Sequence, residues 1–189
     1  MKVLGLCGSL RSQSRSAALL GAAKALAPAG VDFQVFDRHG ELPLFNPDIE
    51  AALPEPAMAL RDAVAAADAI VIVSPEYAHG ISGNMKNTLD WLVGHPPFVF
   101  KPVAVFNPAA DAHHADESLK EILRTMSADL MGDACVRIPV IGAGITSAAD
   151  VVASPMLAAV LVSAWQAVVC HVEGIRARGE AAVRVVFDR

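Results

Sequence analysis

The segment "GSLRSQSRS", Gly8 to Ser16, gathers four hydroxyl side chains and two guanidinium groups within nine residues. It follows an apolar run and precedes residues with helical spacing, so free backbone N–H groups of a helix N-terminus are expected there. Such N–H groups, together with hydroxyl and guanidinium donors, bind phosphate. The residues that could contribute are Ser9, Arg11, Ser12, Ser14, Arg15 and Ser16. A serine-rich loop with an ordinary helix N-cap is the alternative.

This segment is neither a GxxxxGK(S/T) phosphate loop nor a GxGxxG dinucleotide fingerprint, which disfavours ATP hydrolysis and Rossmann-type NAD binding.

The segment "SPEYAHGISGNMKNTLDWL", Ser74 to Leu92, places an unusual set of side chains between an apolar run and an amphipathic helix. Proline and glycine allow the backbone to approach a flat ligand edge-on, while tyrosine offers an aromatic surface and glutamate an acceptor. An isoalloxazine ring, which has apolar faces and a polar edge, needs such partners. The candidate ring-binding residues are Pro75, Glu76, Tyr77, Ala78 and Gly80. His79, in the same loop, is a candidate for contact with a substrate.

The rest of the chain predicts the elements that position these two segments. Runs of Val, Ile and Leu alternate with Ala-rich segments at helical spacing, which is typical of a parallel sheet covered on both faces. The expected strands are Lys2–Cys7, Asp32–Phe36, Ala69–Ser74, Val103–Phe106 and Cys135–Pro139. The expected helices are Ser14–Ala27, Pro56–Ala67, Gly83–Val93, Glu117–Leu130 and Pro155–Arg176.

These elements predict a single α/β domain over residues 1–189, a flavodoxin-like three-layer sandwich with five parallel strands in the order 2-1-3-4-5. In this order ligands bind at the carboxyl ends of strands 1 and 3. The two unusual segments follow those strands, so we expect them to share one cleft.

Composition excludes some classes of protein. The net charge is −5 and no Lys/Arg cluster occurs, which disfavours nucleic-acid binding. The cysteines, Cys7, Cys135 and Cys170, are widely spaced, which fits a reducing compartment and small buried side chains. With no signal sequence recognised, we expect a cytoplasmic location.

The stretch Val151–Cys170 carries no charge and could by length cross a membrane. Ser154 and Pro155 read as an N-cap and first helical position, so a shorter helix buried between the sheet and another subunit is preferred. We therefore expect no membrane contact.

His113 and His114 could form a metal pair, but adjacent side chains point apart and no trusted ligand spacing accompanies them, so a solvated loop is preferred and no metal is expected.

The segments "GSLRSQSRS", "LPLFNPD" and "PEYAHGISGNMKNTLDW" together resemble the NADPH-dependent FMN reductase family, a flavodoxin-like group that includes quinone, azo-dye and chromate reductases. The resemblance implies that the FMN phosphate is held by Ser9, Arg11, Ser14 and Ser16. It implies that Pro75, Glu76 and Tyr77 border the flavin and that the protein forms homodimers or homotetramers.

The sequence departs from the family pattern at four places. Ala78 and Ser82 stand where the family usually has Asn and Pro, and Ser16 stands for an Asn. The loop Asn107–Ser118, commonly glycine-rich in the family, contains no glycine.

The resemblance therefore predicts an FMN-dependent NAD(P)H oxidoreductase that reduces a small-molecule acceptor such as a flavin, a quinone or an azo- or nitro-aromatic compound. Because the flavin performs the chemistry, no catalytic side chain is assigned. Donor, NADPH or NADH, and acceptor would use one slot by turns, in a ping-pong mechanism. An FMN-binding electron carrier, favoured by the altered 107–118 loop, and a homologue with weakened flavin binding are the alternatives.

Overall fold

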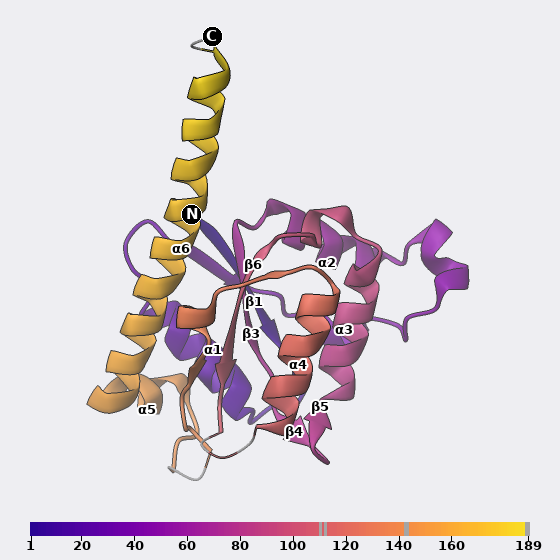
Figure 1. Ribbon diagram of the computed structural model, residues 1–189. Helices are drawn as coiled ribbons and strands as arrows, with labels where there is room; N and C mark the ends of the chain where they lie inside the picture. Colours follow the sequence, from indigo (N-terminus) through magenta and orange to yellow (C-terminus); the bar gives the residue numbers. More distant parts are fainter. Residues whose placement is uncertain (110, 112, 142–143, 188–189) are drawn as a thin grey trace.

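The computed structural model describes residues 1–109, 111, 113–141 and 144–187, with side chains up to residue 178. Its main sheet runs in the order β2-β1-β3-β6-β7, and β8 pairs with the end of β6. All of these pairs are parallel. The strands are β1 (Lys2–Cys7), β2 (Asp32–Val35), β3 (Ala69–Val73), β6 (Pro102–Asn107), β7 (Asp129–Leu130) and β8 (Val136–Arg137). This order confirms the predicted flavodoxin-like 2-1-3-4-5 topology (Figure 1).

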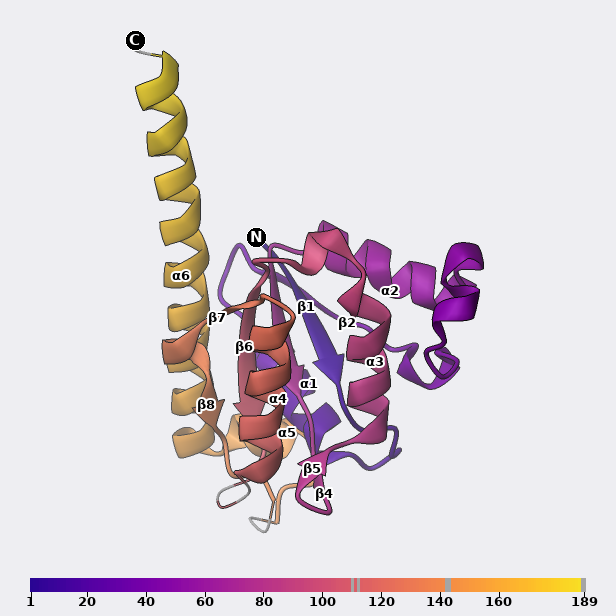
Figure 2. The same cartoon turned by 45° about the vertical axis from the view of Figure 1, so that its right-hand side comes forward.

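Helices cover both faces of the sheet, and Figures 1 and 2 show the resulting three layers. One face carries α1 (Arg15–Ala25), α5 (Ala148–Ala153) and α6 (Pro155–Phe187), whose apolar side chains share a core with the sheet. The other carries α2 (Glu55–Ala66), α3 (Gly83–Val93) and α4 (His114–Thr125) over a second core. Every residue of the central strands β3 and β6 is buried, and all but Asn107 are apolar, as expected of strands with both faces covered.

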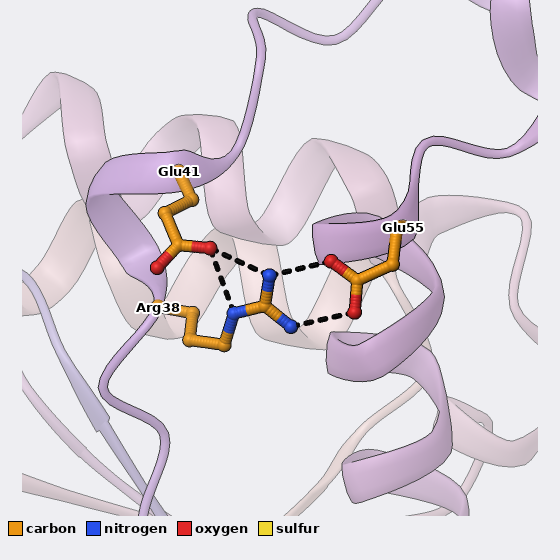
Figure 3. Close-up of polar contacts among 3 residues, drawn as sticks. All are labelled: Arg38, Glu41 and Glu55. Atoms are coloured by element: carbon orange, nitrogen blue, oxygen red, sulfur yellow. Dashed lines mark hydrogen bonds and ion pairs between the residues drawn. The ribbon is translucent and has the colours of Figure 1, made fainter.

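The chain between β2 and α2, rich in proline, forms two short 3₁₀ helices, η1 (His39–Glu41) and η2 (Pro47–Ala52). Arg38 fastens η1 to the start of α2, because its Nε donates to Glu41 at 2.8 Å and its Nη1 to Glu55 at 2.7 Å (Figure 3). Two further 3₁₀ turns, η3 (Pro96–Phe98) and η4 (Gly132–Ala134), precede β6 and β8.

The prediction of one helix over Glu117–Leu130 was wrong at both ends, since α4 runs from His114 to Thr125. The helix ends in a Schellman motif, in which Ser127 takes a left-handed φ of 59° and the Ala128 N–H donates to the Leu123 carbonyl at 2.9 Å. A glycine normally announces this motif. The chain therefore joins the sheet at Asp129, before the end of the predicted helix.

The fifth strand is accordingly split rather than confined to Cys135–Pro139. Asp129 and Leu130 pair with the start of β6, η4 interrupts, and Val136 and Arg137 pair with its end.

The C-terminal helix is longer than predicted. It continues from Pro155 to Phe187 in place of an end near Arg176, so the residues after Arg176 are helical as well. Figure 1 shows its C-terminal part projecting past the rest of the protein. Asp188 and Arg189 lie outside the described residues.

α6 is, by length and composition, long and apolar enough to cross a membrane, with a mean hydropathy of 1.7 over an 18-residue window within Pro155–Arg178. One of its faces is used by the fold, however. The Trp165 ring packs edge-on against Phe33 at 5.1 Å between centroids, and its Nε1 donates to the Ala23 carbonyl at 2.8 Å. This face is a core face, as the preference for a buried helix predicted.

Candidate functional site

The loops that follow β1 and β3 meet at one edge of the sheet. Cys7 and Val73, the last residues of these strands, are direct neighbours in the sheet, so both chains leave it at the same place. A cleft of about 340 Å³ lies between the two loops. Its lining residues are Gly8, Ser9, Leu10, Arg11, Tyr77, Ser82, Gly83 and Asn84. The predicted convergence of the two segments is confirmed.

Gly8 is required by the close approach of the two strand ends. Its N–H donates to the Val73 carbonyl at 2.8 Å. A Cβ on Gly8 would lie 2.4 Å from the Oγ of Ser74 and 2.9 Å from its Cα, which is backbone and cannot rotate away. The absence of a side chain therefore sets the path of the loop.

Ser82 joins the same loop to the start of α3. Its Oγ donates to the Gly8 carbonyl at 2.6 Å and accepts the Met85 N–H at 3.1 Å, which makes it the N-cap of the helix. Ser82 is buried, and it stands where the family commonly has proline. The hydroxyl group makes two hydrogen bonds that a proline side chain could not make.

His39 and Asn84 hold the end of β1. The Cys7 N–H donates to Nε2 of His39 at 3.1 Å, and the Cys7 carbonyl accepts from Nδ2 of Asn84 at 3.1 Å. Burial lowers the pKa of His39 to about 4, with the neighbouring Asp37 acting in the opposite direction. The imidazole is therefore neutral at pH 7.

Neither residue was predicted from the sequence. His39 bonds residues 32 and 49 positions away, and no periodic pattern reports such partners. The only local signal for Asn84 is an amide in the first turn of a predicted helix, a position where a side chain can bond to a neighbouring segment.

The predicted phosphate residues divide into two groups. Ser9 and Arg11 line the cleft, and the Ser9 Oγ accepts the Arg11 N–H at 3.4 Å. Ser14 instead caps α1 by accepting the Ala17 N–H at 3.2 Å, and Ser16 is buried in the first turn, while Arg15 is exposed there. None of the three residues Ser14, Arg15 and Ser16 is among those that line the cleft.

The guanidinium groups of Arg11 and Arg15 are exposed at this helix N-terminus. Within the part of the chain that the structure describes, neither has an ion-pair partner among the recorded pairs. Both charges are thus available to an anion that approaches the start of α1.

The ring-binding segment forms a small hairpin, β4 (Glu76–Tyr77) and β5 (Gly80–Ile81). Its two turn residues, Ala78 and His79, have φ of 50° and 60°. Two left-handed residues are the signature of a type I′ turn, which normally uses Asn-Gly, so the backbone here is strained. Tyr77 is 52% exposed and lines the cleft.

Glu76 faces the other side of the hairpin. Its Oε2 accepts the Ala115 N–H at 2.9 Å, in the first turn of α4, where a carboxylate is favoured by the helix dipole. This contact fixes the hairpin to α4. Pro75 is half-buried and does not line the cleft.

Three histidine rings lie close together beside this contact, tilted relative to one another. The ring centroids of His79 and His114 are 4.2 Å apart, and those of His113 and His114 are 4.1 Å apart. In the described residues no group of three His, Cys, Asp or Glu side chains is placed to hold a metal ion. The rings of His113 and His114 contact each other at a tilt instead of pointing apart as expected from the sequence. Ala110 and Ala112, within the glycine-free loop, lie outside the described residues.

Residues 1–141 match the model of a family described as NADPH-dependent FMN reductase. The chain belongs to this family.

Proteins similar to this chain carry related names. A 113-residue segment is 39% identical to an NAD(P)H-dependent FMN reductase of Pseudomonas aeruginosa, covering 58% of this chain and 60% of that protein. A 91-residue segment is 40% identical to a 2-hydroxy-1,4-benzoquinone reductase of a Burkholderia species, covering 48% of this chain and 49% of that protein. The matched part thus spans about half to three fifths of these curated relatives.

The fold of the chain also matches solved structures. The flavoenzyme NAD(P)H:(acceptor) oxidoreductase FerB from Paracoccus denitrificans superimposes with a TM-score of 0.73 at 26% identity, covering 90% of this chain and 98% of that one. An azoreductase from Bacillus anthracis, 19% identical with a TM-score of 0.54, covers 89% of this chain and 98% of its own and shows the shared fold alone.

The residues present suit FMN. The cleft falls within the 300 to 1,000 Å³ range usual for small-molecule sites, at about 340 Å³. The cation of Arg11 and the aromatic ring of Tyr77 both line this cleft. Gly8 keeps the backbone between them free of a side chain.

Proposed function

We propose that the protein is an FMN-dependent NAD(P)H oxidoreductase that reduces a quinone, flavin, or azo- or nitro-aromatic acceptor. Family membership, the names of the similar reductases and the shared cleft support this proposal. The single observation that carries it is the meeting of the Gly8–Arg11 loop and Tyr77 around one cleft. An anion can be held there beside a planar ring.

FMN, when bound, supplies the hydride-transfer chemistry. Arg11, Arg15 and Ser9 would hold the phosphate, with the N-terminus of α1 adding its partial positive charge. Tyr77 would form one wall of the slot in which a planar donor or acceptor stacks. Ser82 and Asn84 fix the loop that carries these groups. No side chain is asked to act as acid or base.

The phosphate assignment is tested by replacing Arg11. Arg11→Ala should weaken FMN binding about tenfold, because a charge-assisted hydrogen bond to phosphate is lost. Arg124→Ala, which removes an exposed arginine of α4, is the matched control and should bind FMN like the unaltered protein. The measurement is quenching of FMN fluorescence by apoprotein. Equal affinity of both variants would remove Arg11 from the site.

A flavodoxin-like electron carrier is the second candidate, and the glycine-free 107–118 loop is the feature that favours it. Anaerobic mixing with NADPH separates the two functions. A reductase loses its flavin colour within the mixing time, whereas a carrier that lacks a nicotinamide site keeps it.

We also propose a homodimer or homotetramer that uses α6. An apolar groove of about 550 Å³ runs beside this helix. The exposed apolar side chains Met156 and Val162 lie on the same helix. Light scattering of purified protein tests this, and Val162→Asp should shift the mass toward the monomer. A monomeric mass for the unaltered protein would contradict it.

The free cysteines Cys7, Cys135 and Cys170 fit a reducing compartment, and we propose the cytoplasm. Fractionation of cells that produce the full chain tests this location.

A further inference from the structure

We propose that His39 is a positioning residue for the cleft. As a neutral imidazole it fixes the Cys7 peptide and hence the Gly8–Arg11 loop, and it releases that loop when it is protonated. The proposal rests on the proposed function only for the identity of the ligand, FMN.

The geometry begins with the unequal lengths of two strands. β2 pairs with β1 only as far as Gly5, whose partner is Val35, whereas β1 continues to Cys7 beside β3. The N–H and C=O of one strand residue point to the same side. Those of Cys7 face the side on which β2 has ended.

Two side chains replace the missing strand. The Cys7 N–H donates to Nε2 of His39 at 3.1 Å, and its carbonyl accepts from Nδ2 of Asn84 at 3.1 Å. The next residue, Gly8, is the first of the cleft. An imidazole and an amide thus determine where the phosphate loop starts.

The hydroxyl group of Thr88 determines which nitrogen of the His39 ring carries the proton. Thr88 Oγ1 donates to the Asn84 carbonyl at 2.9 Å, so its oxygen is the acceptor for Nδ1 of His39 at 3.2 Å. With its proton on Nδ1, the ring keeps Nε2 free to accept from Cys7. His39 and Thr88 are 5% and 0% exposed.

Protonation of His39 would break its hydrogen bond with the Cys7 N–H. Nε2–H would face the Cys7 N–H, and two donors would then oppose each other inside the protein. Burial is the main factor that lowers the pKa of the ring, while a hydrogen bond to the backbone of Phe36 acts in the opposite direction. The Phe36 ring meets the imidazole edge-on, 5.0 Å between centroids.

The charged groups near His39 are either paired with other side chains or favour the protonated ring. Asp37, adjacent in the chain, favours the protonated ring. Arg38 is paired with Glu41 and with Glu55 of α2.

The elements that pack against the ring contribute little charge. On α3, Lys86 is paired with Asp90. β1 contributes the Cys7 thiol, whose pKa is raised by burial, so it stays uncharged. The imidazole is therefore the group in contact with the Cys7 peptide that becomes charged as the pH falls toward 4.

The test compares the unaltered protein with His39→Gln between pH 7 and pH 4. A glutamine can offer an acceptor to Cys7 and a donor to Thr88, but it does not titrate. His171→Gln, at the far edge of the sheet, is the matched control. FMN titrates identically in all three proteins, so differences between their pH profiles report the side chain.

The first readout is amide hydrogen exchange of Cys7 and Gly8 in the apoprotein, corrected for the intrinsic pH dependence. We expect protection to fall about tenfold toward pH 4 in the unaltered protein and in His171→Gln, and to stay constant in His39→Gln. The second is the FMN dissociation constant from fluorescence quenching, which should show the same contrast. Parallel profiles for all three proteins would overturn the proposal.

A third readout needs no variant. The ¹⁵N shifts of the His39 ring should report the Nδ1–H tautomer and no titration at the ordinary histidine pH. A ring that titrates normally, or carries its proton on Nε2, overturns the proposal even if His39→Gln does not fold. Failure of the apoprotein to bind FMN would instead contradict the proposed function, since the exchange and ring measurements still decide the role of His39.

Discussion

Gly8→Ala should displace the start of the phosphate loop from the end of β3. The added methyl group would lie 2.4 Å from Oγ, 2.8 Å from Cβ and 2.9 Å from Cα of Ser74. Rotation of the Ser74 side chain relieves the first contact but not the other two. Overpacking of this kind costs about 2 kcal/mol. If the Ser82 bond to the Gly8 carbonyl is lost as well, the total reaches about 3 kcal/mol.

Thermal and urea unfolding measure this loss. For a chain of this size, about 3 kcal/mol corresponds to a fall in Tm of roughly 6 to 12 °C. FMN affinity should fall in the same variant, because the loop that holds the phosphate is moved. Adding Ser74→Gly removes the two side-chain contacts and should restore part of both losses.

The matched control is Gly83→Ala in the same cleft. A Cβ on Gly83 meets no atom within 4 Å, and the residue opens α3, where alanine is the better helix former. This variant should keep or slightly raise the stability. Equal losses for Gly8→Ala and Gly83→Ala, or no loss for Gly8→Ala, would refute the reasoning from close approach.

Two further predictions concern acid stability and turn strain. Because burial lowers the pKa of His39 to about 4, below the usual 6.5, the unfolded chain binds more protons between these values; the contribution of this group is complete above pH 6.5 and falls by about 3 kcal/mol as the pH drops to 4. Urea unfolding at pH 7 and pH 4.5 should show this loss in the unaltered protein and a smaller one in His39→Gln, and identical losses would contradict it. Ala78→Gly should stabilise the protein by about 0.5 to 1 kcal/mol, because Ala78 has a φ of 50°; a lower Tm for this variant would show that the turn is not strained.

The strands were the most predictable part of the fold. The runs KVLGLC and AIVIV are buried on both faces, and their observed ends differ from prediction by one residue at most. The end of α4 was not predictable in the same way. It depends on Ser127 in a left-handed conformation, a role for which a glycine is the usual signal.

The sequence indicated the two loops that form the cleft, but not the hairpin or the side chains that hold these loops in place. Of the residues predicted to bind FMN, Ser9, Arg11 and Tyr77 line the cleft, and their binding of FMN stays a prediction. The other predicted residues are not among those that line it: Ser14, Arg15, Ser16, Pro75, Glu76, Ala78 and Gly80. The hairpin escaped notice because its turn residues are Ala78 and His79 rather than Asn-Gly.

The partners of His39 escaped notice for a different reason. Its bonds to Cys7 and Thr88 join segments that only the folded sheet brings together. Local patterns show which residues could contact a ligand, whereas long-range contacts decide what holds them in place.

The most direct test of the account is an anaerobic titration of the FMN-reconstituted protein with NADPH, followed by a quinone. We expect one FMN per chain, loss of the flavin absorbance on addition of NADPH, and its return on addition of the quinone. Apoprotein that retains no FMN, or bound FMN that NADPH leaves oxidised, would contradict the assignment of this cleft to an NAD(P)H-dependent flavin reductase.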